Sequence, residues 1–308
     1  MYRGELIDKI EKLKREKNAV ILSHFYQRPE IQDIADYVGD SLELSKIAQK
    51  TDAEMIVFCG VRFMAETAKI LNPKKKVLHP NPESGCPMAD MATLEGVRKL
   101  KEEYPDAVVV SYINTNADVK TVSDIVVTSR NALKVVKSLK EERIIFVPDQ
   151  FLGGYIAKKV PEKEFILWKG FCPPHFNLSK EALLELKSKY PDAKIAVHPE
   201  CNTDTVEIAD FVGSTSQIVE FATTCEGDTV VIGTEVGIEH TLKKKNPNKR
   251  YLFPQAADYC GTVYCCDMKK NTLEKILDVL EKEINEVILP PDVMEKARIP
   301  LERMLEVV

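Results

Sequence analysis

Three copies of one sequence pattern run through the chain, and this repeat limits the fold more than any other feature. Each copy begins with β-branched and apolar residues, continues through a polar loop, and ends at a Ser or Thr five residues after an aspartate. The copies cover residues 18–41, 106–129 and 192–215. Their aspartates, Asp36, Asp124 and Asp210, are 88 and 86 residues apart. Although a chain of 308 residues would suggest about two domains, the repeat predicts three similar units.

Each unit is expected to contain the same series of helices and strands. The repeat's strand follows an amphipathic helix, and a strand, a helix and a third strand come after it. The expected helices cover residues 6–17, 94–104 and 180–190 before the repeat, and 63–71, 152–159 and 238–245 after it. The later strands are expected at residues 55–58, 143–147, 229–232, 76–79, 164–167 and 250–253. Alternating strands and helices form parallel sheets covered on both faces. We therefore expect an α/β fold of three similar αβα domains, with short parallel sheets arranged about a pseudo-three-fold axis.

The repeat also sets the expected domain boundaries. The first domain should cover residues 1–88, the second 89–174 and the third 175–271, with residues 272–308 forming a C-terminal helix and tail. In the first two units the equivalent helix leads into the next unit. The helix that begins at Thr272 has no following unit, so we expect it to return to the first domain.

Composition excludes several classes of protein. With 44% hydrophobic and 30% charged residues, the chain can bury a core, yet no apolar run approaches the ~18 residues of a membrane helix. A net charge of -5 and a pI near 5.7 give no basic surface for nucleic acid. No secretory signal is visible, so a cytoplasmic protein without membrane spans is expected. The usual motifs of dinucleotide binding, NTP hydrolysis and zinc proteases are absent from the sequence.

Polar residues recur at three positions of the repeat. Three copies about one axis would direct these side chains toward a single centre, at the strand ends where α/β sheets bind ligands. The nine residues are His24, Tyr112 and His198; Tyr26, Asn114 and Glu200; and Ser41, Ser129 and Thr215. Hydroxyls beside free N–H groups at helix starts favour a small, multiply anionic ligand. Simpler roles stay open, because such hydroxyls often cap helices, histidines can fill cores, and the remaining residues can close loops.

Three cysteines share a position in the repeat. Cys86, Cys172 and Cys265 each stand seven residues before a Ser or Thr that is typical of a helix N-cap. Counting from the aspartates instead would select Cys260 as the third member. Thiols near helix N-termini are expected to have a lowered pKa and can bind metal. Three thiolates on a four-iron cluster leave one iron open to a substrate, whereas single cysteines are more often buried apolar residues.

The remaining cysteines and histidines carry no repeat signal. The cysteines that do not recur, and that we interpret as structural, are Cys59, Cys201, Cys225 and Cys266. Three histidines are left without an assignment: His79, His175 and His240. Of these, His175 lies three residues after Cys172, which would bring it near a metal centre.

Ten short motifs in order resemble the quinolinate synthase family, over nearly the whole chain. The motifs are His24-Phe-Tyr26-Gln27, Gly39-Asp-Ser41-Leu, Gly85-Cys86-Pro-Met-Ala, Ser111-Tyr112-Ile-Asn114, Thr128-Ser129, Cys172-Pro-Pro-His175, Val197-His198-Pro-Glu200-Cys201, Gly213-Ser-Thr215, Gly233-Thr-Glu235 and Cys265-Cys-Asp-Met268-Lys. The resemblance implies a three-domain enzyme of NAD biosynthesis with one oxygen-sensitive [4Fe-4S] cluster per chain. It further implies condensation of iminosuccinate, made by L-aspartate oxidase, with dihydroxyacetone phosphate, which yields quinolinate, phosphate and water.

Carried over by position, the resemblance assigns roles to individual residues. It implies that Cys86, Cys172 and Cys265 hold the cluster and leave one iron open. The pocket would be lined by His24, Ser41, Tyr112, Asn114, Ser129, His198, Glu200 and Thr215. Catalytic roles would fall to Glu200 and Tyr26 as the foremost proton-transfer candidates, with His198 and Tyr112. Some family members carry Cys-x-x-Cys-x-x-Cys near the third ligand, whereas here the cysteines are 260, 265 and 266.

Two other functions remain open from the residues themselves. Another [4Fe-4S]-dependent hydro-lyase would share the three cysteines. A non-catalytic iron-sulfur carrier would need only those cysteines, and it would leave the nine convergent polar residues unexplained.

Overall fold

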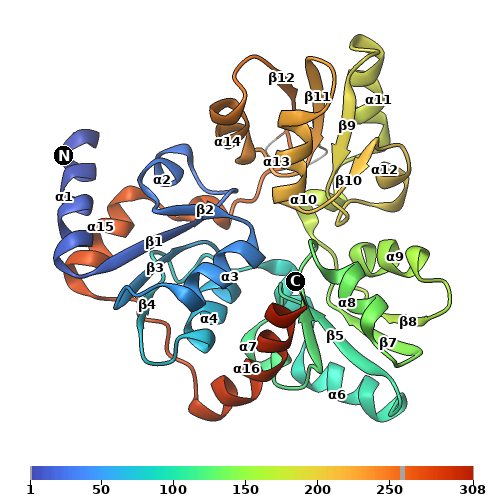
Figure 1. The fold of residues 1–308 in the computed structure, drawn as a ribbon, viewed down its shortest axis with the longest axis horizontal. Helices are drawn as coiled ribbons and strands as arrows, with labels where there is room; N and C mark the ends of the chain where they lie inside the picture. Colours follow the sequence, from blue (N-terminus) through green and yellow to red (C-terminus); the bar gives the residue numbers. More distant parts are fainter. Residues whose placement is uncertain (1, 257–260, 308) are drawn as a thin grey trace.

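The computed structural model describes residues 2–256 and 261–307, which form three lobes around a common centre (Figure 1). Each lobe holds a four-stranded parallel sheet, and with the strands of each unit numbered along the chain the order across the sheet is 2-1-3-4. In chain order this is the same arrangement three times, with the first strand of each unit inside the sheet. The predicted α/β fold with three similar αβα units is confirmed.

The predicted helices and strands occur in the predicted order, and each unit also has a short second strand and further short helices that the sequence did not predict. The first unit contains α1 (Arg3–Glu16), β1 (Ala19–His24), α2 (Pro29–Ile34), β2 (Tyr37–Gly39), α3 (Ser41–Lys50), β3 (Met55–Cys59), α4 (Arg62–Leu71) and β4 (Lys76–Leu78). The second contains α5 (Pro87–Met91), α6 (Leu94–Glu103), β5 (Val108–Tyr112), α7 (Ala117–Lys120), β6 (Ile125–Val127), α8 (Ala132–Ser138), β7 (Arg143–Val147), α9 (Gln150–Lys159) and β8 (Glu164–Leu167). The third contains α10 (Pro173–Phe176), α11 (Lys180–Lys189), β9 (Lys194–Val197), α12 (Thr203–Glu207), β10 (Phe211–Val212), α13 (Thr215–Thr224), β11 (Thr229–Gly233), α14 (Ile238–Lys245) and β12 (Arg250–Leu252). The 3₁₀ helix η1 (Met268–Lys270), α15 (Leu273–Lys282) and α16 (Pro291–Glu306) complete the chain's elements.

The repeated aspartate has a structural role in every unit. In the first unit its Oδ2 accepts the N–H of Ile21 in the central strand at 2.8 Å, and the equivalent bonds to Val109 and Ile195 have the same length. Each aspartate directly precedes the short strand that pairs with the end of the central strand. The carboxylate therefore continues the hydrogen bonding of the central strand where its neighbour is too short to do so.

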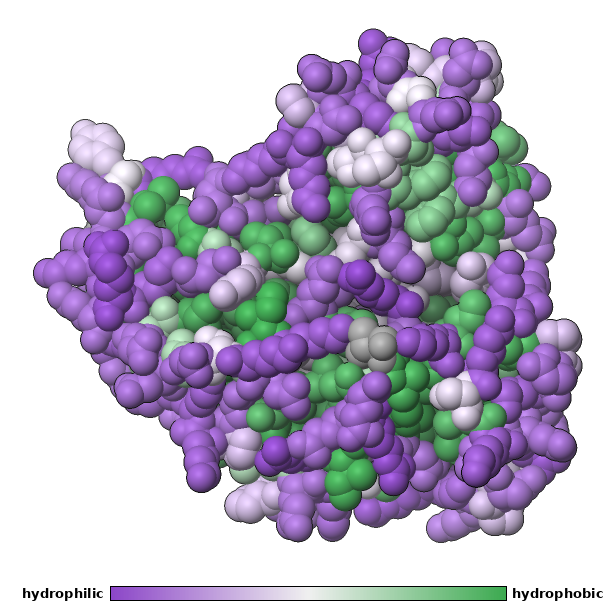
Figure 2. Space-filling model, in the orientation of Figure 1, coloured by the Kyte–Doolittle hydropathy of each residue, from purple (hydrophilic) through white to green (hydrophobic). Residues whose placement is uncertain are grey.

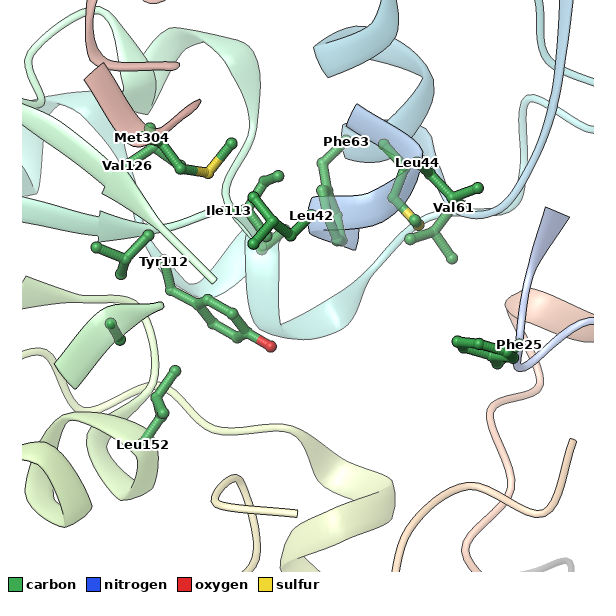
Figure 3. Close-up of a cluster of buried hydrophobic side chains, with 14 of the residues drawn as sticks. Phe25, Leu42, Leu44, Val61, Phe63, Tyr112, Ile113, Val126, Leu152 and Met304 are labelled. Carbon is green, nitrogen blue, oxygen red and sulfur yellow. The ribbon is translucent and has the colours of Figure 1, made fainter. Parts of the chain in front are cut away.

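Two C-terminal helices close the arrangement. The apolar face of α15, including Ile276 and Leu280, packs against Leu6 and Ile10 of α1 in one buried cluster on the first sheet. Figure 1 shows these two helices side by side, although they lie at opposite ends of the sequence. The last helix, α16, contacts α4 of the first unit and both α7 and β6 of the second, and Figure 3 shows its Met304 beside β6.

The surface and the helix lengths agree with the composition. On the face drawn in Figure 2, hydrophilic residues dominate the outer parts of the lobes, and hydrophobic residues are seen mainly in the recesses between them. Within residues 2–256 and 261–307, no helix is both long and apolar enough to cross a lipid bilayer.

Helix α9 contains two adjacent glycines that differ in their surroundings. A Cβ on Gly153 would lie 2.6 Å from a methyl carbon of Leu167 and 2.7 Å from the ring of Phe146, both in the second sheet. A Cβ on Gly154 would meet only Leu167, at 3.9 Å. Gly153 therefore allows the helix to approach the sheet closely, whereas Gly154 has room for a side chain.

We predict opposite effects of the two alanine substitutions in α9. Gly153→Ala should lower the free energy of unfolding by about 1–3 kcal/mol because the core is overpacked. Gly154→Ala should raise it by about 0.5–1 kcal/mol because alanine favours the helix. Urea unfolding followed by circular dichroism measures both, and equal effects would contradict the close approach of α9 to the sheet.

Candidate functional site

A cavity of about 280 Å³ lies where the carboxyl ends of the three sheets meet. All twelve residues that the sequence predicts for the site line this cavity: His24, Tyr26, Ser41, Cys86, Tyr112, Asn114, Ser129, Cys172, His198, Glu200, Thr215 and Cys265. Every unit contributes four of them. The structure therefore brings together both the polar positions and the cysteines that the repeat selects.

The hydroxyl groups are not used as helix caps. Ser41 and Thr215 are the first residues of α3 and α13, and the caps are the preceding residues, Asp40 and Ser214, which accept backbone N–H groups. Ser129 lies ahead of α8, and its Oγ is 3.2 Å from Nε2 of His198. The capping interpretation is therefore wrong for Ser41 and Thr215, whose hydroxyls stay directed to the cavity beside the helix N-termini.

Two histidines are held by the same local hydrogen bond. The N–H of Tyr26 donates to Nδ1 of His24 at 3.1 Å, and the N–H of Glu200 donates to Nδ1 of His198 at 3.3 Å. Because Nδ1 accepts, each ring carries its proton on Nε2. Burial, with the charge of Lys269 nearby, lowers the pKa of His24 to about 3. Burial likewise lowers the pKa of His198 to about 4, so both rings are neutral donors near neutral pH.

Glu200 is the acceptor at the centre of the network. Its Oε1 accepts the hydroxyl of Tyr112 at 2.6 Å, and its Oε2 lies 2.9 Å from Nδ1 of His175. Burial alone would raise the pKa of Glu200, but the imidazoles of His198 and His175 and the two hydrogen bonds hold it below its usual range. Burial and this carboxylate raise the pKa of Tyr112, whose hydroxyl extends away from the apolar side chains in Figure 3. The pair is thus an ionised carboxylate and a protonated phenol.

A chain of hydrogen bonds joins Tyr26 to Glu200. The Tyr26 hydroxyl lies 2.8 Å from Oγ1 of Thr215 and 2.7 Å from Oγ1 of Thr234. Thr234 in turn lies 2.8 Å from Nε2 of His175, which contacts Glu200 through its other nitrogen. Burial and the Glu200 charge raise the pKa of Tyr26 well above its ordinary value. The path can therefore pass a proton between Tyr26 and Glu200 while every member keeps a partner.

A buried lysine supports the loop that carries Asn114. Lys120 lies fully buried, and its Nζ donates to the backbone oxygen of Ile113 at 2.9 Å and to that of Thr115. Burial lowers the pKa of Lys120 to about 8, against the opposing effect of the nearby Glu66. The hydrogen bonds from Lys120 hold the loop in place, and Asn114 of the same loop lines the cavity.

The three cysteines follow one design in two units and another in the third. Cys86 and Cys172 are the N-caps of α5 and α10, each of which begins with proline. Cys265 precedes η1 without being its cap. The expectation of a lowered thiol pKa is wrong for the protein without metal: desolvation by burial raises the pKa of Cys265 to about 12 and also raises the pKa of Cys86 and of Cys172. Backbone N–H groups next to the sulfurs only partly oppose this effect.

The donor set fits an iron-sulfur cluster. Three thiols, one from each unit, share one cavity wall, and each sulfur accepts a backbone N–H. Bound iron removes the thiol protons and offsets the desolvation that disfavours thiolates. A second donor set overlaps it, because the ligand atoms of Cys172, His175 and Glu200 lie within 4.8 Å of one another. Thiols from all three units favour the cluster, since soft thiolate ligands select iron-sulfur centres.

Several cavity residues were not predicted. His175, Glu235 and Cys266 also line the cavity, and Thr234 lies behind it. The equivalent positions at the end of β3 and β7 hold Gly60-Val61 and Pro148-Asp149, so Thr234-Glu235 gives no repeat signal. The sequence signals for these residues were the spacing of His175 from Cys172 and the motifs of the family resemblance that contain Glu235 and Cys266.

The other candidates lie elsewhere or cannot be placed. His79 contacts the backbone oxygen of Gly60 in the interior, and His240 pairs with Asp33 near the surface at 2.7 Å. Cys260, the alternative third ligand, lies outside the described residues.

Comparison with known proteins identifies the family of the chain. The sequence matches the family described as NadA, quinolinate synthetase A protein, over residues 8–306. A protein named quinolinate synthase from Sulfurihydrogenibium sp. is 81% identical over 307 residues, covering 100% of both chains. Proteins of the same name from Aquifex aeolicus and Clostridioides difficile are 63% identical over 302 residues and 51% over 293 residues. These matches cover 98% and 95% of this chain and 94% and 95% of the two relatives. The chain therefore belongs to the quinolinate synthase family.

Proposed function

We propose that this protein makes quinolinate for NAD biosynthesis by condensing iminosuccinate with dihydroxyacetone phosphate, releasing phosphate and water. The observation that carries the proposal is the convergence of nine polar residues and three thiols, drawn equally from three units, on one cavity. An iron-sulfur carrier needs the thiols alone and gives no reason for the polar residues. A different hydro-lyase is distinguished by its substrates and products.

The cavity suits small anionic substrates. Neutral Nε2–H donors of His24 and His198, together with hydroxyls at the starts of α3 and α13, can bind carboxylate and phosphate oxygens. The side-chain oxygen of Asn114 is buried and has no hydrogen-bond partner within the described residues. Because such a group is costly to leave unpaired, it is available to accept a hydrogen bond from a substrate.

Proton transfer is assigned to Glu200 and Tyr26. The ionised Glu200 can accept a proton from a substrate carbon or nitrogen, and the path through His175 and Thr234 can return it at the Tyr26 hydroxyl. Tyr112 holds the carboxylate through its hydroxyl, and His198 holds the backbone of Glu200 by accepting its N–H. When bound, a [4Fe-4S] cluster on three thiolates supplies one open iron as a Lewis acid.

The proposal also covers the setting of the enzyme. Iminosuccinate would come from L-aspartate oxidase, so the two enzymes would be functionally coupled in the cytoplasm. The proposed partners are therefore small molecules and that oxidase, with no nucleic acid.

The direct test is product formation under anaerobic conditions. Protein containing the cluster, mixed with iminosuccinate and dihydroxyacetone phosphate, should form quinolinate and one phosphate per turnover, as measured by mass spectrometry and a phosphate assay. Conversion without quinolinate would instead support another hydro-lyase.

We predict that each of the three cavity cysteines is required for the cluster. Each single variant, purified anaerobically, should lose most of the visible iron-sulfur absorption and bound iron, because it removes a soft ligand. The three variants are Cys86→Ser, Cys172→Ser and Cys265→Ser. Cys225→Ser is the control, since Cys225 does not line the cavity. Loss of the absorption in Cys260→Ser, with retention in Cys265→Ser, would show that the third ligand is wrongly assigned.

We predict that Glu200→Gln slows quinolinate formation by about 10²- to 10⁴-fold, the usual contribution of a general base. Glutamine keeps the shape and one acceptor oxygen, so iron content should not change. Glu207→Gln is the matched control, because Glu207 makes only an exposed pair with Lys158. Normal turnover per cluster in Glu200→Gln, combined with a lower melting temperature, would show that the carboxylate is structural.

A further inference from the structure

A buried ion pair next to the cavity is not used by the proposed reaction. Glu235, at the end of β11, and Lys269, in η1, lie 2.9 Å apart with side chains 1% and 8% exposed. Apolar replacements of buried pairs are often neutral or stabilising, since desolvation opposes the attraction. Stability alone therefore does not account for this pair.

The pair joins two parts of the site. Oε1 of Glu235 accepts the backbone N–H of Cys265 at 3.2 Å, and Oε2 accepts that of Gly237 at 2.7 Å. Nζ of Lys269 also donates to the backbone oxygen of Tyr26. The third cluster cysteine is thus tied through two side chains to the loop of a proton-transfer residue.

Cys265 needs such support more than the other cysteines do. Cys86 and Cys172 are fixed as caps of helices that begin with proline, whose geometry is preset. Cys265 lies in the connection between β12 and η1, which forms no helix or strand within residues 253–256 and 261–267. The backbone oxygen of Cys265 accepts the N–H of Lys269 at 3.3 Å, and the N–H of Val236 donates to the backbone oxygen of Val263 at 2.9 Å, so the bond to Glu235 is the one that fixes the N–H side of Cys265.

A glycine makes space for the pair. A Cβ on Gly237 would lie 2.7 Å from Oε2 of Glu235, 2.7 Å from Nζ of Lys269 and 2.8 Å from Cα of Tyr26. The φ angle of Gly237 is -57°, which any residue can adopt. The absence of a side chain, and not backbone freedom, is therefore what this position requires.

We propose that Glu235, with Lys269, is a positioning residue that fixes the backbone of Cys265 and so holds its thiol as the third cluster ligand. The proposal rests on the cluster assignment in the proposed function. Outer partners of metal ligands typically contribute about 10- to 100-fold to metal retention, and the contact to the Cys265 N–H is a partner of this kind.

Two double variants isolate that contact. Both remove the buried charges: one combines Glu235→Gln with Lys269→Met (the Gln/Met variant), and the other combines Glu235→Ala with Lys269→Met (the Ala/Met variant). Only the Gln/Met variant keeps a side-chain oxygen for the Cys265 N–H. Anaerobically purified holoprotein is mixed with an iron chelator, and iron release is followed by absorbance. The Ala/Met variant should release iron about 10- to 100-fold faster than the Gln/Met variant.

Amide hydrogen exchange provides a readout independent of turnover. Peptides covering residues 261–267 should exchange faster in the Ala/Met variant than in the Gln/Met variant, in holoprotein and in protein stripped of iron. Circular dichroism measures the folded fraction of each variant. If the Ala/Met variant does not fold, Gly237→Ala takes its place in the comparison.

Gly237→Ala disturbs the pair without changing a charge. It should release iron faster than wild type, by a factor approaching that of the Ala/Met variant. Gly154→Ala is its control, because that position has room for the added methyl group. If the wild-type protein holds its cluster, and the two double variants release iron and exchange amide hydrogens at equal rates, the positioning role is overturned. The cluster assignment then still stands. A wild-type protein without iron-sulfur absorption would overturn the cluster assignment itself.

Discussion

One hydrogen bond, made three times, sets the geometry on which the site depends. In the first unit the Asp36 carboxylate accepts the N–H of Ile21 at 2.8 Å, which fixes the loop against the central strand. Three residues beyond Ile21 the strand ends at His24, and five residues beyond Asp36 stands Ser41. Because the same bond recurs at 2.8 Å in the other units, six polar side chains arrive at one centre in equivalent positions.

This explains which parts of the site the sequence could predict. Positions shared by the three copies converge because the backbones are alike, so all nine polar residues, Cys86 and Cys172 could be located from spacing, whereas two counts of the third thiol gave Cys265 and Cys260. Thr234 and Glu235 occur in one copy only, and their partners come from distant segments, so the repeat did not identify them and only the family resemblance included their motif. The direction of the thiol pKa shift was also wrong, because the desolvation of a cavity wall depends on neighbours that a sequence pattern does not reveal.

No lysine or arginine is among the described residues that line the cavity, and two buried lysines beside it are bonded to backbone oxygens instead. Lys120 and Lys269 each donate to backbone oxygens of the loop that follows the first strand of a unit, the loops of Asn114 and Tyr26. The charge of each lysine is thereby used to hold a loop, and the polar groups that line the cavity include imidazole, hydroxyl and amide groups and the carboxylate of Glu200. Fixed dipoles of this kind need little reorganisation when charge develops on a substrate.

The packing of α15 on α1 has a consequence for the order of assembly. Chains are made from the N-terminus, and units generally begin to fold as they emerge. The apolar face that Leu6 and Ile10 present packs on the first sheet and on residues 273–280 of α15, so this part of the first unit can begin to form early but is completed last. We therefore expect the nascent protein to expose this apolar face throughout most of its synthesis, and to require chaperone protection there until translation has passed α15.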